Sequence, residues 1–371
     1  MLRAAVLAVT ALASSTLVAA QSIDFAAVNR APKPTQLGPP TAGATLSQTP
    51  TYAPSVAAAS ASAAVATQAA GNDQKRFIRA KRDSTLVARN ACDAQPSGAA
   101  PVTDPDTADA FLANSVYTDA QAAAPVPQGY SLVFQNLQGA TQQNGYLGYY
   151  TLQSYDSIKC QQYCDATTTC TAFNVYLERD PSVEPGAGCD NPASTVYYKC
   201  SLYGLPISNT TATNTGQWRD NFQVVITASN GYVKNPPPAS LPAFNGPNPL
   251  AGAINAPNDH CGTSSYLGVY FFPGPYDPSP CAAACQATTQ YDAAHLVDPL
   301  DAYDACNFFV AYVLSENNAP LGTYCALYRR YWSSRYATNT GQYDSEGNYF
   351  SVSQTYGYTL AQQDPGVLQN P

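Results

Sequence analysis

Residues 160–170 have the sequence CQQYCDATTTC, and residues 281–285 have the sequence CAAAC. A spacing of four places both cysteines of each Cys-x3-Cys pair on one face of a helix. Asp156 and Asp277 stand just upstream, where a carboxylate can cap the first turn, and Pro278 suits the first helical position. Each pattern therefore predicts a short helix that two disulfides can fasten to a sheet.

Apolar and aromatic stretches after each helix predict the strands of that sheet. The predicted strands are residues 171–177, 197–203 and 222–228 after the first helix, and 307–314, 324–328 and 349–354 after the second. The expected fold class is α+β, with a short helix packed on a small antiparallel sheet, formed twice. Modules of this size have modest cores, so each disulfide is expected to contribute about 2–4 kcal/mol of stability.

The two stretches belong to an internal repeat. Four cysteines of the first copy return in the same order in the second: Cys160, Cys164, Cys170 and Cys200 as Cys281, Cys285, Cys306 and Cys325. The six residues ATNTGQ at 212–217 return unchanged at 337–342. This agreement indicates that one module is present two times.

The repeat sets the expected domain boundaries. They are a signal peptide (1–20), a disordered segment rich in Ala, Ser, Thr and Pro (21–82), an N-terminal extension (83–128), the first module (129–233), a Pro-rich linker (234–256), the second module (257–360) and a tail (361–371).

The N-terminus is typical of a secretory signal peptide, because Arg3 precedes the apolar residues 4–13 and small residues end the segment at 18–20. Residues 42–70 are nearly all small or polar, and burial of such side chains cannot offset the loss of chain entropy. This composition predicts disorder.

A basic cluster follows at residues 75–82, with dibasic pairs that end at Arg76 and Arg82. These pairs resemble sites for a Golgi processing protease of the kexin type, which favours a propeptide that is removed. The alternative is a charged linker that stays attached.

Composition narrows the classes of function. The chain has 371 residues and 11 cysteines, so at least one cysteine is unpaired or forms an intermolecular disulfide. Cysteine usage together with the signal peptide predicts a secreted protein of the extracellular space or cell wall. A net charge of −8 without a basic stripe argues against nucleic acid as partner, and no later segment is apolar enough for a membrane span.

The cysteine order resembles that of the PAN/apple domain family: Cys-x3-Cys on a helix, a third cysteine before a strand and a fourth on a later strand. Over residues 129–360 the chain is also similar to fungal secreted proteins with tandem apple-like modules. The resemblance implies the disulfides Cys160–Cys200, Cys164–Cys170, Cys281–Cys325 and Cys285–Cys306. Cys92, Cys189 and Cys261 depart from the family pattern, and Cys92–Cys189 is the pairing we expect among them.

Candidate catalytic and metal-binding groups are few. Two histidines lie in no nucleophile–base motif, the cysteines are not spaced as zinc ligands, and Asp298, Asp301 and Asp304 lack a calcium-loop pattern. No cofactor or metal is expected. Glu178 and Asp180 could serve as the acid and base of a glycoside hydrolase, although an exposed turn held by an ion pair is the simpler interpretation.

Aromatic residues are the better lead. Rings can stack on sugar faces, and the candidates for binding are Trp218, Trp332, Tyr203 and Tyr328. The alternative is that most of the aromatic side chains fill a core. Asn209 begins the triplet Asn-Thr-Thr, an acceptor for N-glycosylation.

These features favour a non-enzymatic extracellular binding or adhesion protein, for which the family resemblance implies a carbohydrate or protein ligand. A polysaccharide hydrolase and a structural cell-wall component are the alternatives.

Overall fold

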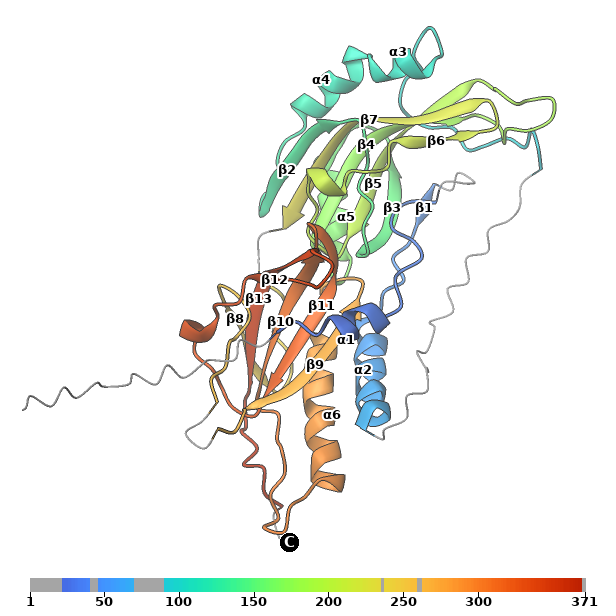
Figure 1. Ribbon diagram of the computed structural model, residues 1–371. Helices are drawn as coiled ribbons and strands as arrows, with labels where there is room; N and C mark the ends of the chain where they lie inside the picture. Colours follow the sequence, from blue (N-terminus) through green and yellow to red (C-terminus); the bar gives the residue numbers. More distant parts are fainter. Residues whose placement is uncertain (1–21, 41–45, 70–89, 235–236, 259–261, 369–371) are drawn as a thin grey trace, which may run out of the picture.

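The computed structural model describes residues 22–40, 46–69, 90–234, 237–258 and 262–368. Two sheets form its framework, and the strands within each are antiparallel. Figure 1 shows one sheet above the other, with α5 beside the first and α6 beside the second. The predicted α+β class, with mixed helices and antiparallel sheets, is confirmed.

The first sheet has seven strands in the order β1-β3-β5-β4-β7-β2, with β6 also paired to β7. Their bounds are β1 Ser47–Gln48, β2 Tyr130–Leu137, β3 Tyr146–Leu152, β4 Ala172–Pro181, β5 Ser194–Tyr203, β6 Gly216–Arg219 and β7 Phe222–Lys234. Helix α5 (Ser157–Ala166) lies against this sheet, and the short helix η1 (Asn209–Thr211) follows β5. Asp156 caps α5 as predicted, since its carboxylate accepts a hydrogen bond from the amide of Lys159.

The second sheet has six strands in the order β12-β13-β10-β11-β9, with β8 also paired to β13. Their bounds are β8 Phe244–Pro249, β9 Tyr266–Pro273, β10 Phe308–Glu316, β11 Ala319–Tyr328, β12 Gly341–Tyr343 and β13 Tyr349–Leu360. Helix α6 (Ser279–His295) lies against this sheet, and η2 (Ser334–Tyr336) follows β11. The carboxylate of Asp277 accepts a hydrogen bond from the Ser279 amide, while Pro278 precedes the helix instead of occupying its first position.

The repeat of the sequence is also a repeat of strand order. Without β1, the first sheet contains β3-β5-β4-β7-β2 and the second contains β9-β11-β10-β13-β8, with β6 and β12 at equivalent places. The register agrees too, because Val175 pairs with Cys200 and Ala311 pairs with Cys325. Both sheets are larger than the small sheets expected, because the sequence pattern did not predict β1, β2, β3 and β6 in the first sheet or β8, β9 and β12 in the second. We call residues 129–234 the first repeat and residues 237–368 the second.

The described residues contain five disulfides: Cys92–Cys189, Cys160–Cys200, Cys164–Cys170, Cys281–Cys325 and Cys285–Cys306. Four are the pairs that the family resemblance implies, and the fifth is the additional pair we expected. In each repeat the first helical cysteine bonds to the middle of a strand, and the second bonds to the cysteine that precedes the neighbouring strand. The four pairs within the repeats are buried, whereas Cys92 is exposed.

The expectation of disorder between residues 21 and 82 is wrong for the parts that the structure describes. Helix α1 (Phe25–Arg30), strand β1 and helix α2 (Pro54–Ala69) lie against the two repeats. Helix α2 packs along α6 and buries Ala61 and Val65. The small side chains of α2 cannot form a hydrophobic core by themselves, but they allow α2 to pack closely against α6.

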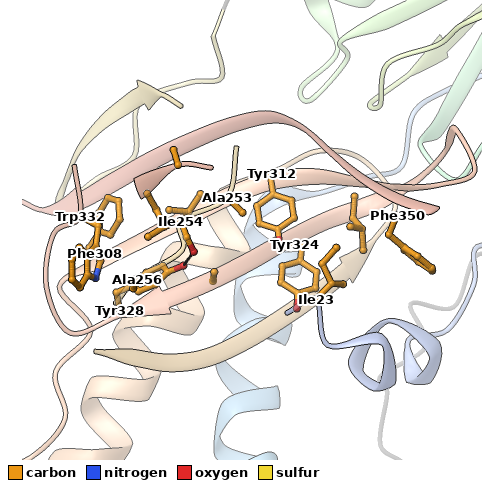
Figure 2. Packing of buried hydrophobic residues seen from close by; sticks show 14 of the residues in the cluster. Ile23, Ala253, Ile254, Ala256, Phe308, Tyr312, Tyr324, Tyr328, Trp332 and Phe350 are labelled. Carbon is orange, nitrogen blue, oxygen red and sulfur yellow. Dashed lines mark hydrogen bonds between the residues drawn. The ribbon is translucent and has the colours of Figure 1, made fainter. Parts of the chain in front are cut away.

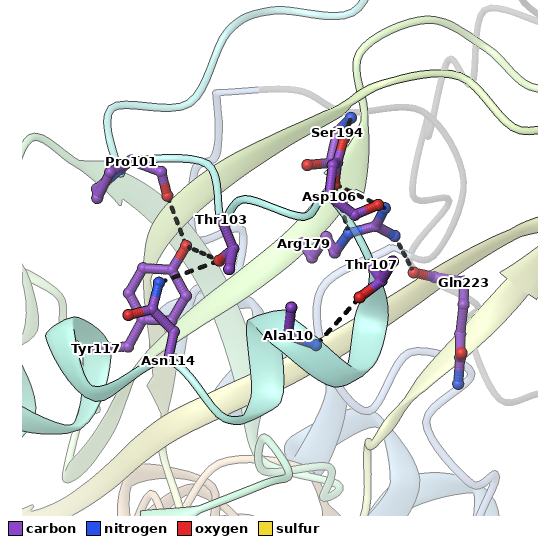
Figure 3. A network of polar contacts seen from close by, with 10 residues as sticks. All are labelled: Pro101, Thr103, Asp106, Thr107, Ala110, Asn114, Tyr117, Arg179, Ser194 and Gln223. Atoms are coloured by element: carbon purple, nitrogen blue, oxygen red, sulfur yellow. Dashed lines mark hydrogen bonds and ion pairs between the residues drawn. The ribbon is translucent and has the colours of Figure 1, made fainter.

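The described part of the N-terminal extension, residues 90–128, is also folded onto the first repeat. Helices α3 (Ala108–Leu112) and α4 (Ser115–Ala123) pack on β7. The guanidinium of Arg179 on β4 holds this segment, because its Nη2 donates to Oδ1 of Asp106 at 2.9 Å (Figure 3). Two segments distant in sequence are thereby joined by a largely buried ion pair.

The predicted linker (234–256) and tail (361–371) contribute to the second repeat as well. The linker contains β8, whose prolines are accepted because β8 has a neighbour on one side only, and Ile254 is fully buried in the core shown in Figure 2. In the tail, the carbonyl of Asp364 accepts a hydrogen bond of 2.8 Å from the Asn307 amide group. Independent movement of these segments is therefore not expected.

Several predictions fall on residues that the structure does not describe: the signal peptide (1–20), the processing sites Arg76 and Arg82, and Cys261. They stay predictions. None of the helices in the described part of the chain is long and apolar enough to cross a bilayer.

Candidate functional site

The loop that follows the last disulfide-bonded strand differs strongly between the repeats. It has the sequence GLPISNTT at residues 204–211 after β5, and RRYWSSRY at residues 329–336 after β11. The two loops align without a gap, since they lie between equivalent cysteines and the shared ATNTGQ sequence. One position in each loop therefore corresponds to one position in the other.

In the first repeat this loop forms a contact between the repeats. Leu205 is fully buried and belongs to the apolar core of the second repeat, together with Tyr276. The amide of Tyr276 donates to the carbonyl of Gly204 at 2.6 Å. The apolar side chain of Leu205 thus stabilises the contact between the two repeats.

In the second repeat the equivalent loop forms a surface pocket of about 490 Å³, a size typical of small-ligand sites. Its lining comes entirely from the second repeat: Pro257, Asn258, Arg330, Tyr331, Trp332, Ser333, Arg335 and Tyr336. We call this the Arg/aromatic pocket.

Contacts with neighbouring side chains hold the aromatic rings of the pocket in place. Trp332 is buried, and its Nε1 donates to Oγ of Ser265 at 2.8 Å. Tyr336 meets the indole edge to face, with 4.8 Å between ring centres. Tyr331 is 55% exposed and rests with its ring edge against Phe308. The pocket thus has a rigid indole base and one exposed ring at its rim.

Two arginines complete the pocket. The guanidinium of Arg330 lies 4.6 Å from the centre of the Trp332 ring, and that of Arg335 lies 4.6 Å from the Tyr336 ring. Arg335 also donates to the Tyr336 hydroxyl at 2.7 Å. The ion pairs found among the described residues include neither arginine, whereas the adjacent Arg329 pairs with Asp304 at 2.8 Å.

This arrangement is suited to an anion that also presents a flat face. A guanidinium offers a planar fork of donors that matches a carboxylate or sulfate, and stacking on an aromatic ring limits its conformational freedom. The first repeat has Leu205, Ile207 and Thr210 at the positions of Arg330, Trp332 and Arg335. The site therefore belongs to the second repeat alone.

The structure separates the four binding residues proposed from the sequence. Trp332 lies in the pocket, as its base. Tyr203 and Tyr328 are fully buried, and their hydroxyls donate to the carbonyls of Thr141 and Ile254 at 2.5 and 3.2 Å. A ligand role for these two tyrosines is wrong, because neither reaches the surface.

Trp218 lies on β6 of the first repeat and is 65% exposed. Its equivalent in the second repeat is Tyr343 on β12, which is 69% exposed. An exposed ring is thus present at the same place in both repeats, outside the Arg/aromatic pocket. Arg330 and Arg335 were missed from the sequence, because their lack of an acidic partner depends on tertiary contacts.

Glu178 and Asp180 do not form an exposed turn. They lie on β4, are 7% and 6% exposed, and share the ammonium group of Lys199, which contacts Glu178 and lies 3.5 Å from Asp180. Burial and the neighbouring Asp180 raise the pKa of Glu178 to about 8. Arg179 points to the other face of the strand, toward Asp106. Cleavage of a glycoside needs both carboxyls to reach a sugar ring, which this burial disfavours.

The loop with Asp298 and Asp304 has internal partners. One carboxylate oxygen of Asp298 accepts the amides of Leu300 and Ala302, both at 2.8 Å, and Asp304 is paired with Arg329. Within the described part of the chain, no group of three or more His, Cys, Asp or Glu side chains is arranged to hold a metal ion.

Asn209, the expected glycosylation acceptor, is exposed in η1, in the loop equivalent to the Arg/aromatic pocket. The hydroxyl of Thr211, the third residue of the triplet, accepts the amide of Ser208 at 3.1 Å. A glycan on Asn209 would project from the first repeat into solvent.

Comparison with protein-family models gave no match for this chain. Comparison with curated proteins and with solved structures gave no significant match either.

Proposed function

We propose that this chain is a secreted, non-enzymatic binding protein of the PAN/apple type that recognises an acidic carbohydrate through the Arg/aromatic pocket. The resemblance in cysteine order supports the family assignment, as do the four disulfides within the repeats and the strand order that the two repeats share. The resemblance itself implies recognition of carbohydrate or protein outside the cell.

The single observation that carries the proposal is the pair of arginines stacked on aromatic rings without an acidic partner among the described residues. The chain has a net charge of −8, whereas the exposed Arg330 and Arg335 bring two positive charges to this pocket. Uronate carboxylates and sulfate esters both match a guanidinium fork, and the exposed ring of Tyr331 can lie against a sugar face.

The hydrolase alternative rests on Glu178 and Asp180. Their burial around Lys199 gives them a structural role as a shared ion pair, and this favours binding over glycoside cleavage. The cell-wall alternative rests on a disordered N-terminal segment, but the described parts of that segment are folded onto the repeats.

A panel of immobilised polysaccharides tests the proposal. Retention on a polyuronate or a sulfated glycan, with little retention on chitin, β-glucan and mannan, is the expected result. Equal retention on neutral and acidic polymers would contradict the proposal, as would retention on none of them. Release of reducing sugar that disappears in Glu178→Gln would favour the hydrolase instead.

A further inference from the structure

The described residues between 22 and 69 pass from the second repeat to the first and back again (Figure 1). We call these residues, 22–40 and 46–69, the N-terminal strap. They contact both repeats at three places, and each contact uses a different kind of surface.

The strap first meets the second repeat. Ile23 is buried among the core residues of that repeat, near Tyr324 and Phe350 (Figure 2). The amide of Ile23 donates to Oε1 of Gln342 at 2.9 Å, and the amide of Asp24 donates to the Tyr324 hydroxyl at 2.7 Å. An apolar side chain and two backbone donors are satisfied at this contact.

The strap then reaches the first repeat, where β1 pairs with β3. The Thr151 amide donates to the carbonyl of Leu46 at 2.9 Å, and the Tyr146 hydroxyl donates to Oε1 of Gln48 at 2.8 Å. Without the strap, β3 would be the edge of the first sheet, with its outer backbone groups unpaired.

The strap finally returns to the second repeat. The Tyr52 hydroxyl donates to Oδ2 of Asp277, just before α6, at 2.9 Å. Helix α2 then packs along α6, with Ala61 and Val65 buried while Val56 on the same helix is 58% exposed. The buried positions are four residues apart and mark the face of α2 that meets the body.

All of these contacts are noncovalent, because the first cysteine of the chain is Cys92. The basic cluster at 75–82 lies between the strap and the disulfide-bonded body. We propose that the strap is a docked clamp: when the chain is cut in this cluster, residues 22–69 stay bound as a second chain and hold the two repeats together. The docking surface comprises the contact with Tyr324 and Gln342 on the second repeat, the outer edge of β3 and the side of α6 that faces α2.

Cleavage of the full chain followed by native size-exclusion chromatography tests this proposal. The sequence from 75 to 80 is replaced by the recognition site of a site-specific protease, so that one peptide bond is hydrolysed. The expected result is one native peak that contains both pieces, which separate under denaturing conditions. A strap fragment that elutes alone, while the body keeps its near-ultraviolet circular dichroism, would overturn the proposal.

A matched pair of variants locates the contact. In the cut protein, Val65→Asp should increase the dissociation rate of the fragment at least tenfold, whereas Val56→Asp should leave it unchanged. Tyr52→Phe is a milder third variant, which removes only the hydrogen bond to Asp277 and should also speed release. Equal dissociation rates for all variants and the original chain would overturn the proposed docking surface. This test does not involve the Arg/aromatic pocket, so it stands apart from the proposed function.

Discussion

The guanidinium of Arg330 lies 4.6 Å from the ring centre of Trp332, in a loop whose counterpart in the first repeat contains neither a cation nor an aromatic ring. That counterpart contributes Leu205 to the core of the second repeat. The same loop therefore has two uses. In the first repeat the loop joins the two repeats. In the second repeat the residues of the equivalent loop line the Arg/aromatic pocket instead.

Truncation of the two tryptophans should affect the stability of the protein very differently. Trp332→Ala should lower the free energy of unfolding by about 3–5 kcal/mol, because the indole is buried and its removal leaves a cavity. Trp218→Ala should change it by less than about 0.5 kcal/mol, because that ring is exposed. Urea denaturation of both variants measures the difference, and a similar loss in both would contradict the assigned burial.

The charged cluster on β4 and β5 should be held by its single cation. Lys199→Met should cost about 3–5 kcal/mol of stability, because it leaves the carboxylate of Asp180 buried without a counter-charge. Glu178→Gln should cost much less, since Lys199 keeps Asp180 as partner. Chemical denaturation at pH 7 compares the two variants. A larger loss of stability in Glu178→Gln than in Lys199→Met would contradict the central role of Lys199.

The same cluster predicts a dependence of stability on pH. Burial raises the pKa of Glu178 to about 8 from an ordinary value of 4.5, so the folded state holds this proton more tightly than the unfolded chain does. The contribution of Glu178 to stability is therefore complete below pH 4.5 and is lost as the pH rises through about 8. Denaturant midpoints measured from pH 5 to pH 9 should fall less in Glu178→Gln than in the original chain. Identical slopes would refute the shifted pKa.

The disulfides should be reduced in a defined order. Cys92 is exposed and Cys189 is half-buried, whereas the eight cysteines within the repeats are buried. After free thiols have been blocked, mild reductant should open Cys92–Cys189 first, and alkylation with mass spectrometry should detect these two sites before any other. Earlier labelling of a pair from either repeat would contradict this order.

The helices were predictable because a spacing of four residues encodes one helical face locally, whereas the disulfide pairing within the repeats was implied by the resemblance in cysteine order. The ends of the strands were not predictable. The predicted strand at 171–177 continues through Pro181 in the structure, since the charges of Glu178 and Asp180 are compensated by Lys199 from a neighbouring strand. Such compensation is a long-range property that hydrophobic patterning does not record.

The N-terminal strap and the pocket escaped prediction for a related reason. Composition shows that residues 42–70 cannot build a core alone, but it does not show that α6 and β3 supply one. Trp332 was a candidate from its residue type. The importance of Arg330 and Arg335 follows from their positions over aromatic rings and away from carboxylates of the described residues, and these positions are set by the fold.

Direct titration with an acidic oligosaccharide is the most decisive measurement for the proposed binding site. The double variant Arg330→Gln/Arg335→Gln should bind at least tenfold more weakly than the original chain, because two charge-assisted contacts are lost. The control Lys33→Gln/Lys159→Gln removes the same charge from exposed positions elsewhere and should bind normally. Equal affinity in the arginine variant and the original chain, or equal weakening in both double variants, would contradict a specific anion site in the second repeat.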